Sequence, residues 1–195
     1  MNSNRLQKLL FISLVAGSTL LSGCAAVVVG GAAVSAVTVT EDKRTLGTQI
    51  DDSTTESRIS SAIAKVPNVK DVANVNLHVY NGVALLMGQA RDHSIRNAIA
   101  KAAATVPHVT QIHNQIRIGE PIPTSTEAHD VWLASKVRTQ LLADKQVDFL
   151  KIDVSVEDSE VFLMGLVTQE QASKAIDIAR NVSGVVKVVN VFEVL

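Results

Sequence analysis

The sequence has little of what usually marks an enzyme or a disulfide-stabilised exported protein. Its 195 residues include 1 Cys, 1 Trp, 1 Tyr and 4 Pro, and aromatic residues make up 3% of the chain. Because a single thiol cannot form an intramolecular disulfide, no cross-link within the chain can stabilise the fold. A Gly-rich phosphate loop, G-x-S-x-G and H-E-x-x-H are all absent from the sequence. We therefore expect a protein without catalytic activity and without a cofactor.

Histidine is present but is not arranged for metal binding. The five residues are spread along the chain, at His78, His93, His108, His113 and His129. Only His108 and His113 are close in sequence, and no third ligand accompanies them as a zinc site would need. We expect no metal site.

The chain also lacks a strong excess of either positive or negative charge. The chain has 18 Lys+Arg and 19 Asp+Glu, a formal net charge of −1. Nucleic-acid-binding domains are usually strongly basic, so the overall charge argues against a nucleic-acid partner. Any attraction to an anionic surface must come from a local group of basic residues.

No apolar run is long enough for a membrane-spanning helix. The run from Leu9 to Leu21 is about 13 residues and follows Arg5 and Lys8, whereas a span needs roughly 20 residues. This order is typical of a secretory signal. The segment that ends it, Leu21-Ser22-Gly23-Cys24, resembles the bacterial lipobox, in which the cysteine becomes the acylated first residue. We expect a lipoprotein signal peptide over 1–23 and a lipid anchor at Cys24.

The residues after Cys24 predict where the anchor lies. Ala25 stands where many inner-membrane lipoproteins have Asp, so the resemblance implies the outer membrane of a Gram-negative cell, with the body of the protein facing the periplasm. Several acyl chains anchor a protein stably where one chain is marginal. Residues 25–40 are small and Val-rich, and we expect a lipidated tether over 24–45; strand-like aggregation of the Val-rich segment is the alternative.

The rest of the chain repeats itself. Residues 57–69 match 135–147 at a shift of 78, residues 75–90 match 152–167 at 77, and residues 113–118 match 189–194 at 76. Loop deletions explain the drift, since tandem domains tolerate them. We expect one domain over 46–119, a Pro-containing linker over 120–127 and a second domain over 128–195. Domains of about 65 residues without disulfides are near the lower limit of independent stability, so the two are expected to touch.

Each copy reads helix, strand, strand, helix, strand. In the first copy Ile59, Ile63 and Val66 form a helical face, and Val75, Leu77 and Val79 alternate with polar residues as in a strand with one buried side. Asn81-Gly82 predicts a hairpin turn, and the segment from Val83 to Ala90 predicts an apolar strand. Asp92 or Ser94 can cap a second helix, and a last strand is expected from Val109 to Ile118.

Polar and apolar residues at the strands of the second copy allow further expectations. Four acidic residues, Asp153, Glu157, Asp158 and Glu160, predict a solvated hairpin edge that discourages strand pairing. The last strand is apolar on both faces, with Val188, Val189, Val191, Phe192 and Val194. Either it is a central strand, or one face contacts the other domain. Asn114 and Asn190 lie on apolar faces and are expected to hydrogen-bond backbone.

The layout resembles the BON family of small periplasmic and osmotically induced bacterial domains. The likeness rests on Leu86-Met87-Gly88 and Leu163-Met164-Gly165, which close the second strand of each hairpin, and on the Asn of each last strand. With the lipobox, the whole chain resembles a dual-BON outer-membrane lipoprotein. The resemblance implies an α+β fold of two tandem domains, each α-β-β-α-β with a small three-stranded mixed sheet packed by two helices.

The lone tryptophan lies on a helix of the second copy, on the side that faces away from its own core. On a helical wheel over 130–142, Leu133, Val137 and Leu141 form the core stripe. The opposite side holds Val131, Trp132, Ser135, Arg138, Thr139 and Leu142, with Lys136 at its flank. In the first copy these six outward positions are Ser53, Thr54, Ser57, Ser60, Ser61 and Ala64. The fold therefore does not require the tryptophan face.

Three readings of this face remain open from the residues alone. Trp132 is covered by the first domain or the tether; or it anchors a protein partner; or it inserts into lipid at headgroup level beside Lys136 and Arg138. The family resemblance implies the third, with preference for anionic phospholipid of the phosphatidylglycerol type. It also implies enrichment at the division site and support of envelope integrity, of outer-membrane protein assembly and of amidase control. A periplasmic adaptor for those machineries is the alternative function.

Overall fold

The computed structural model describes residues 46–195. The expected signal peptide, Cys24 and the tether over 24–45 lie outside the described residues. Within 46–195 the element order repeats once, over 46–118 in the first domain and over 124–194 in the second. The expected α+β fold of two α-β-β-α-β units is confirmed. No helix from residue 46 onward is both long and apolar enough to cross a membrane.

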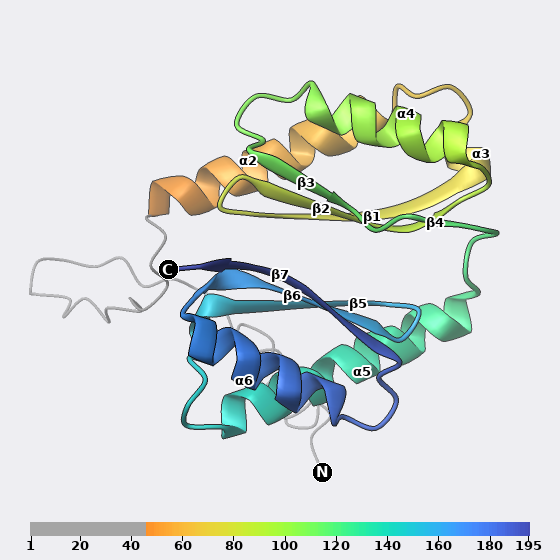
Figure 1. The fold of residues 1–195 in the computed structure, drawn as a ribbon. Helices are drawn as coiled ribbons and strands as arrows, with labels where there is room; N and C mark the ends of the chain where they lie inside the picture. Colours follow the sequence, from red (N-terminus) through yellow and green to blue (C-terminus); the bar gives the residue numbers. More distant parts are fainter. Residues whose placement is uncertain (1–45) are drawn as a thin grey trace, which may run out of the picture. The chain divides into compact units, whose positions relative to one another are not determined.

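The first domain packs two main helices on one face of a small sheet (Figure 1). Its elements are α2 (Leu46–Ile63), the short α3 (Val69–Val72), β1 (Ala73–Tyr80), β2 (Val83–Ala90), α4 (His93–Ala104), β3 (Gln111–Asn114) and β4 (Arg117–Ile118). Strand β1 is antiparallel to β2, whereas β3 and β4 are parallel to it. The last strand was expected to be continuous but is divided into β3 and β4. Val66, expected on the first helix, lies in the turn after α2.

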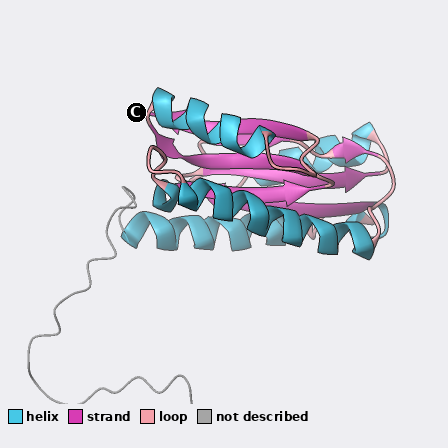
Figure 2. Cartoon of the chain, turned by 90° about the horizontal axis from the view of Figure 1, so that it is seen from below, coloured by secondary structure: helices cyan, strands magenta, loops and turns pink. Residues whose placement is uncertain are grey.

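The second domain repeats this arrangement with a continuous last strand. Its elements are α5 (Thr124–Ala143), the 3₁₀ turn η1 (Phe149–Lys151), β5 (Ile152–Glu157), β6 (Glu160–Val167), α6 (Gln169–Arg180) and β7 (Lys187–Val194). The strand order is β5-β6-β7, with β5 antiparallel and β7 parallel to β6. Figure 2 shows α5 and α6 lying along the strands of this sheet. Helix α5 starts inside the expected linker, because the Pro123 carbonyl accepts from the Thr126 and Glu127 amides at 2.9 and 3.2 Å.

The core stripe predicted for α5 is buried, as are Ile59 and Ile63 of the face predicted for α2. In α5, Leu133, Val137 and Leu141 are 0% exposed and pack on β5 and β6. In α2, Ile59 is 0% and Ile63 is 7% exposed in the core of the first domain. Burial of each such aliphatic side chain contributes about 1.5–3 kcal/mol, so each domain has a core of its own.

A buried aspartate in the second turn of α2 and of α5 holds the hairpin turn of its own domain. The Asp52 carboxylate accepts from the Asn81 and Gly82 amides at 2.7 and 2.9 Å. At a shift of 78, the Asp130 carboxylate accepts from the amides of residues 158 and 159 at 2.6 and 2.9 Å. The turn residues have positive φ, as expected for Asn81-Gly82. Sequence analysis missed this pair, although an aspartate at the same place in both copies was the available signal.

The glycine of each Leu-Met-Gly segment lies against the neighbouring strand. Gly88 has a φ of +110°, and a Cβ there would lie 2.1 Å from the Asn74 carbonyl oxygen. Gly165 has a φ of +150°, and a Cβ there would lie 2.1 Å from the Lys151 carbonyl oxygen. No side chain fits at either position, which explains the glycine at this place in both β2 and β6.

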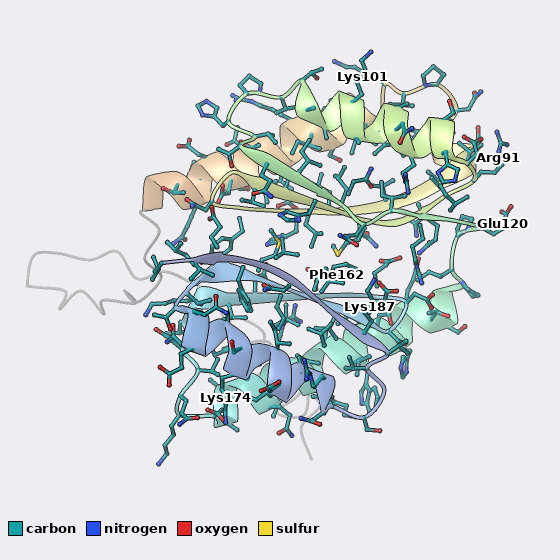
Figure 3. The ribbon with its side chains drawn as sticks, in the orientation of Figure 1. Arg91, Lys101, Glu120, Phe162, Lys174 and Lys187 are labelled. Carbon is teal, nitrogen blue, oxygen red and sulfur yellow. The ribbon has the colours of Figure 1, made fainter. Side chains whose placement is uncertain are left out.

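The two domains share a third core. It consists of Tyr80, Val83, Leu85, Met87, Phe162, Met164 and Val191, each no more than 4% exposed. Phe162 projects from the face of its sheet that carries no helix (Figure 3). Because β7 is an edge strand, the expectation of a central strand is wrong and that of a contact between the domains is right. Every residue of the three cores lies within 46–195.

The acidic hairpin of the second domain is not the solvated edge that the sequence predicts. Glu157 is 5% exposed and accepts from the side-chain amides of Asn76 and Gln89, both at 2.8 Å. The Arg117 guanidinium donates to Asp158 at 2.6 Å. These polar residues belong to the first domain, so both carboxylates have partners there. The residue pattern of a single strand could not show that these carboxylates are paired, because their partners lie in the other copy.

The asparagines of the last strands hydrogen-bond backbone, as expected. The Asn114 side-chain oxygen accepts from the Ile116 amide at 3.2 Å. The Asn190 side-chain oxygen accepts from the Phe192 amide at 3.0 Å. Both therefore stabilise the strand locally. Asp92 likewise caps α4 by accepting from the Ile95 amide at 3.0 Å, which settles the choice between Asp92 and Ser94.

Candidate functional site

The seven residues predicted on the outward side of α5 all lie away from the core of the second domain. Val131, Trp132 and Leu142 are 70%, 54% and 67% exposed, which is unusual for large apolar side chains. Ser135, Arg138 and Thr139 are exposed and Lys136 is half-buried. The first domain therefore does not cover Trp132; the tether, the other cover considered for it, lies outside the described residues.

The indole of Trp132 is held in place from two sides. The Lys136 Nζ lies 4.4 Å from the centroid of its ring, and the His129 ring centroid lies 5.5 Å away with the planes tilted by 41°. The same Nζ donates to the Ser183 carbonyl at 2.7 Å. Since Ser183 follows α6, Lys136 links the two helices of the domain while its charge rests on the aromatic face.

Beside Trp132 the surface is hollowed between α5 and α6. This α5–α6 groove has a volume of about 600 Å³. It is lined by Trp132, Ser135, Lys136, Thr139 and Gln140 from α5 and by Ile178, Asn181, Val182 and Ser183 from α6 and the turn after it. Four of the seven predicted residues therefore come together in one groove. Gln140 and the α6 wall were missed, because a wheel of one helix carries no information about the helix beside it.

The other predicted residues lie outside this groove. The Arg138 guanidinium donates to the Val154 carbonyl on β5, and Val131 and Arg138 line a separate hollow next to that strand. Leu142 is exposed at the C-terminal end of α5. The predicted face is thus a central indole and groove, flanked by an arginine on the side of β5.

One carboxylate near Arg138 has a shifted pKa. Burial raises the pKa of the Asp153 carboxyl, but its hydrogen bond and ion pair with His78 outweigh this, and the pKa lies below the usual 3.8. The charge of Arg138 acts in the same direction. Asp153 therefore stays ionised at neutral pH and ties β5 to β1 of the first domain.

The first domain has a groove at the same place but of different chemistry. It lies between α2 and the end of α4, with a volume of about 440 Å³, and is lined by Thr54, Ser57, Arg58, Ser61, Ala62, Lys65, Thr105, Val106 and Pro107. At a shift of 78, Thr54 stands where the second domain has Trp132, and Arg58 stands where it has Lys136. The basic position is kept and the aromatic one is not.

Side chains that could bind a metal do not gather in the part of the chain that the structure describes. Between residues 46 and 195, no group of three His, Cys, Asp or Glu is placed as metal ligands would be. Exposed apolar groups and cations are what the α5 surface offers. These suit adhesion to an amphipathic partner.

The comparisons with known proteins agree with the repeat. The BON domain family model matches residues 51–120 and again 129–195. The chain belongs to the BON family. It is 38% identical over 185 residues to "Outer membrane lipoprotein DolP" of Haemophilus influenzae, covering 94% of this chain and 95% of that protein. The expected two-domain BON protein of this type is confirmed.

Two further relatives share most of the length. The "21 kDa hemolysin" of Actinobacillus pleuropneumoniae is 39% identical over 150 residues, covering 77% of each chain. "Osmotically-inducible protein Y" of Escherichia coli is 26% identical over 148 residues, covering 74% of this chain and 73% of that protein. The similarity thus extends over about three quarters of this chain in relatives that carry different names.

Proposed function

We propose that this BON protein is a lipid-anchored, periplasm-facing phospholipid-binding protein of the outer membrane, and that it is not an enzyme. Helix α5 recognises anionic phospholipid of the phosphatidylglycerol type. In this way the protein supports outer-membrane integrity, with enrichment at the division site. The lipobox ending at Cys24 and the relative named as an outer membrane lipoprotein support the location.

One observation carries the proposal: the second domain exposes an indole that its fold does not use. Trp132 is 54% exposed and has a cation over its ring, while the matching Thr54 of the first domain is small and polar. An indole favours the headgroup level of a bilayer, and basic residues complement lipid phosphates. Val131 and Leu142 extend the apolar surface on either side of Trp132 along α5.

The energies suit weak and reversible contact. Burying a Trp-sized apolar area at roughly 25 cal/mol per Å² gives a few kcal/mol before ordering costs. Each basic residue near an anionic surface adds about 1 kcal/mol. Such contact would not hold a free protein firmly, but on a chain already tethered to a membrane it selects where the protein dwells, since tethering raises the effective concentration.

The alternative function is a periplasmic adaptor that uses the same face. Exposed Trp and Arg side chains are also typical of protein-interface hot spots. Its partners would be the outer-membrane assembly machinery or activators of cell-wall amidases. Substituting Trp132 would weaken both functions, so only protein-free membranes separate them.

The test uses Trp132 as its own reporter. Residues 46–195, which hold all three cores, are titrated with vesicles of phosphatidylcholine alone or with phosphatidylglycerol added, and the tryptophan emission is followed. We expect a blue shift with the anionic vesicles only. Emission that stays at long wavelength with both vesicle types would contradict lipid binding and favour the adaptor.

A further inference from the structure

The geometry points to α6 as the second wall of the lipid site: we propose that the α5–α6 groove takes the upper part of one acyl chain of the phospholipid, with the lipid phosphate on the Lys136 ammonium. This inference rests on the proposed function and deepens it. It makes the site a groove that grips a single lipid molecule, and not only a helix face that lies on a membrane.

The dimensions of the groove fit part of one acyl chain. Its volume of about 600 Å³ is within the range of small-molecule sites. Along α5 it extends from Trp132 to Gln140, which at 1.5 Å per residue is about 12 Å. A space of that volume and length admits part of one acyl chain but not a folded partner.

Each helix contributes apolar side chains to the groove. The indole of Trp132 is on the α5 side, and Ile178 and Val182 are on the α6 side. Ile178 is half-buried and Val182 is 7% exposed, so both are fixed against the core of the domain. A methylene chain between these walls would be removed from water on both sides, which a flat helix surface cannot achieve.

The charge at the groove suits a phosphate at one end. Lys136 is the one charged residue among the nine that line the groove, and no carboxylate opposes it there. An ammonium has three donors. The Ser183 carbonyl takes one and the indole face lies next to the group, which leaves donor capacity for a lipid phosphate. A cation held by two protein contacts is already positioned before the ligand arrives.

The first domain shows what the groove is without this lining. Ala102 stands at a shift of 76 from Ile178, and Thr54 replaces the indole. Its groove keeps a cation at Arg58 and has Val106 where the second domain has Val182, but it lacks the indole and the isoleucine. We therefore expect the acyl chain to bind only in the groove of the second domain.

The first experiment removes the membrane. Residues 46–195 are titrated with dihexanoyl phosphatidylglycerol below its micelle concentration, and with glycerol 3-phosphate as the headgroup alone, while Trp132 emission is followed. We expect a saturable change with the short-chain lipid and none with glycerol 3-phosphate. Equal responses to both would mean a phosphate site without a chain, and would overturn the proposal.

The second experiment fills the groove. Thr139→Phe places a ring among the lining residues while adding apolar surface to α5. In a groove, overpacking weakens binding of the short-chain lipid by about tenfold or more. On a flat inserting helix, the added ring would strengthen vesicle binding instead. Ser61→Phe, at the matching place in the first domain, is the control and should leave binding unchanged.

The outcomes separate the two proposals. Vesicle binding without binding of the monomeric lipid would overturn the groove and leave the proposed function standing. Absence of binding to both anionic vesicles and monomer would overturn both. Monomer binding that Thr139→Phe leaves unchanged would show that the lipid sits elsewhere, and would also overturn the groove.

Discussion

The first helices of the two domains, α2 and α5, have similar apolar inner faces and chemically different outer faces. Inside, Ile59 and Ile63 of α2 correspond to Val137 and Leu141 of α5, and all four are buried. Outside, α2 carries serine, threonine and alanine where α5 carries the exposed Trp132 and its neighbours. The shared positions are those on which the fold depends. The positions that differ are those that the fold leaves free, and function is to be sought among them.

Three further pairs belong to the shared set. Gly88 and Gly165 let the strands approach, two aspartates hold the hairpin turns, and two asparagines bond the last strands. Each pair makes the same contact in both domains. Changing both members should therefore give matched effects, whereas changes on the outer faces should affect the second domain alone.

The largest effect is expected at the glycines. Gly88→Ala and Gly165→Ala each place a methyl group 2.1 Å from a backbone oxygen at positive φ. We expect each to lower the free energy of unfolding by about 3 kcal/mol, measured by urea denaturation of residues 46–195. Gly119→Ala, where nothing lies within 4 Å of the added carbon, is the control and should change little. A mild effect at only one of the two glycines would break the equivalence of the domains.

The aspartate pair should come next. Asp52→Ala and Asp130→Ala each leave two backbone amides of a hairpin turn without their acceptor. The expected loss is about 2 kcal/mol for each variant, again by urea denaturation. Asp177→Ala removes an ion pair in which both side chains are 62% exposed, and should stay within about 0.5 kcal/mol. An equally large loss of unfolding free energy in Asp177→Ala would contradict a particular role for the buried Asp52 and Asp130 carboxylates.

A smaller effect is expected on lipid affinity when the outer faces are exchanged. Trp132→Thr gives the second domain the residue of the first and should weaken binding to phosphatidylglycerol vesicles about tenfold, by loss of apolar burial. Adding Thr54→Trp places an indole four residues before Arg58 on α2. Recovery should be only partial, because Ala102 stands in place of Ile178. Full recovery in a vesicle sedimentation assay would show that the second wall contributes nothing.

The smallest effect concerns pH. The pKa of Asp153 is below its usual 3.8, so its ionised form stabilises the folded state above that pH, and this stability is lost as the pH falls below 3.8. Asp153→Asn, which introduces the residue of the matching position 76, should flatten that acid-side slope. The cost at pH 7 should be below about 1 kcal/mol, since the side chain is 32% exposed. Stability curves from pH 2 to 7 that coincide with those of the unaltered chain would contradict the role of the His78 contact.

Much of the fold follows from the repeat in the sequence. Alternation predicted β1, the Asn-Gly pair predicted its turn, and the run from Val83 to Ala90 matched β2 residue for residue. The start of α5 was missed because Pro123 reads as a linker, although a proline can precede a helix as well as end one. The break between β3 and β4 left no mark in the residue pattern.

Only part of the candidate site could be predicted from the sequence. The exposed residues of α5 follow from one helix and one comparison with the other copy. The α6 wall and the burial of Glu157 do not, because each depends on residues brought close only by the tertiary fold. Acidic residues on a strand look solvated until the amides that bind them, Asn76 and Gln89, are found in the other domain.

The shared core also limits how this protein can be taken apart. Leu85 and Met87 face Phe162 and Met164 across it, with the same two positions of the repeat used from each side. A gene cut after Gly119 would encode a first half whose sheet has lost its cover. We expect such a half to form a homodimer, in which a second copy covers the exposed face of the sheet. Because both domains contribute side chains to this core, we expect that neither can be removed without exposing apolar surface of the other.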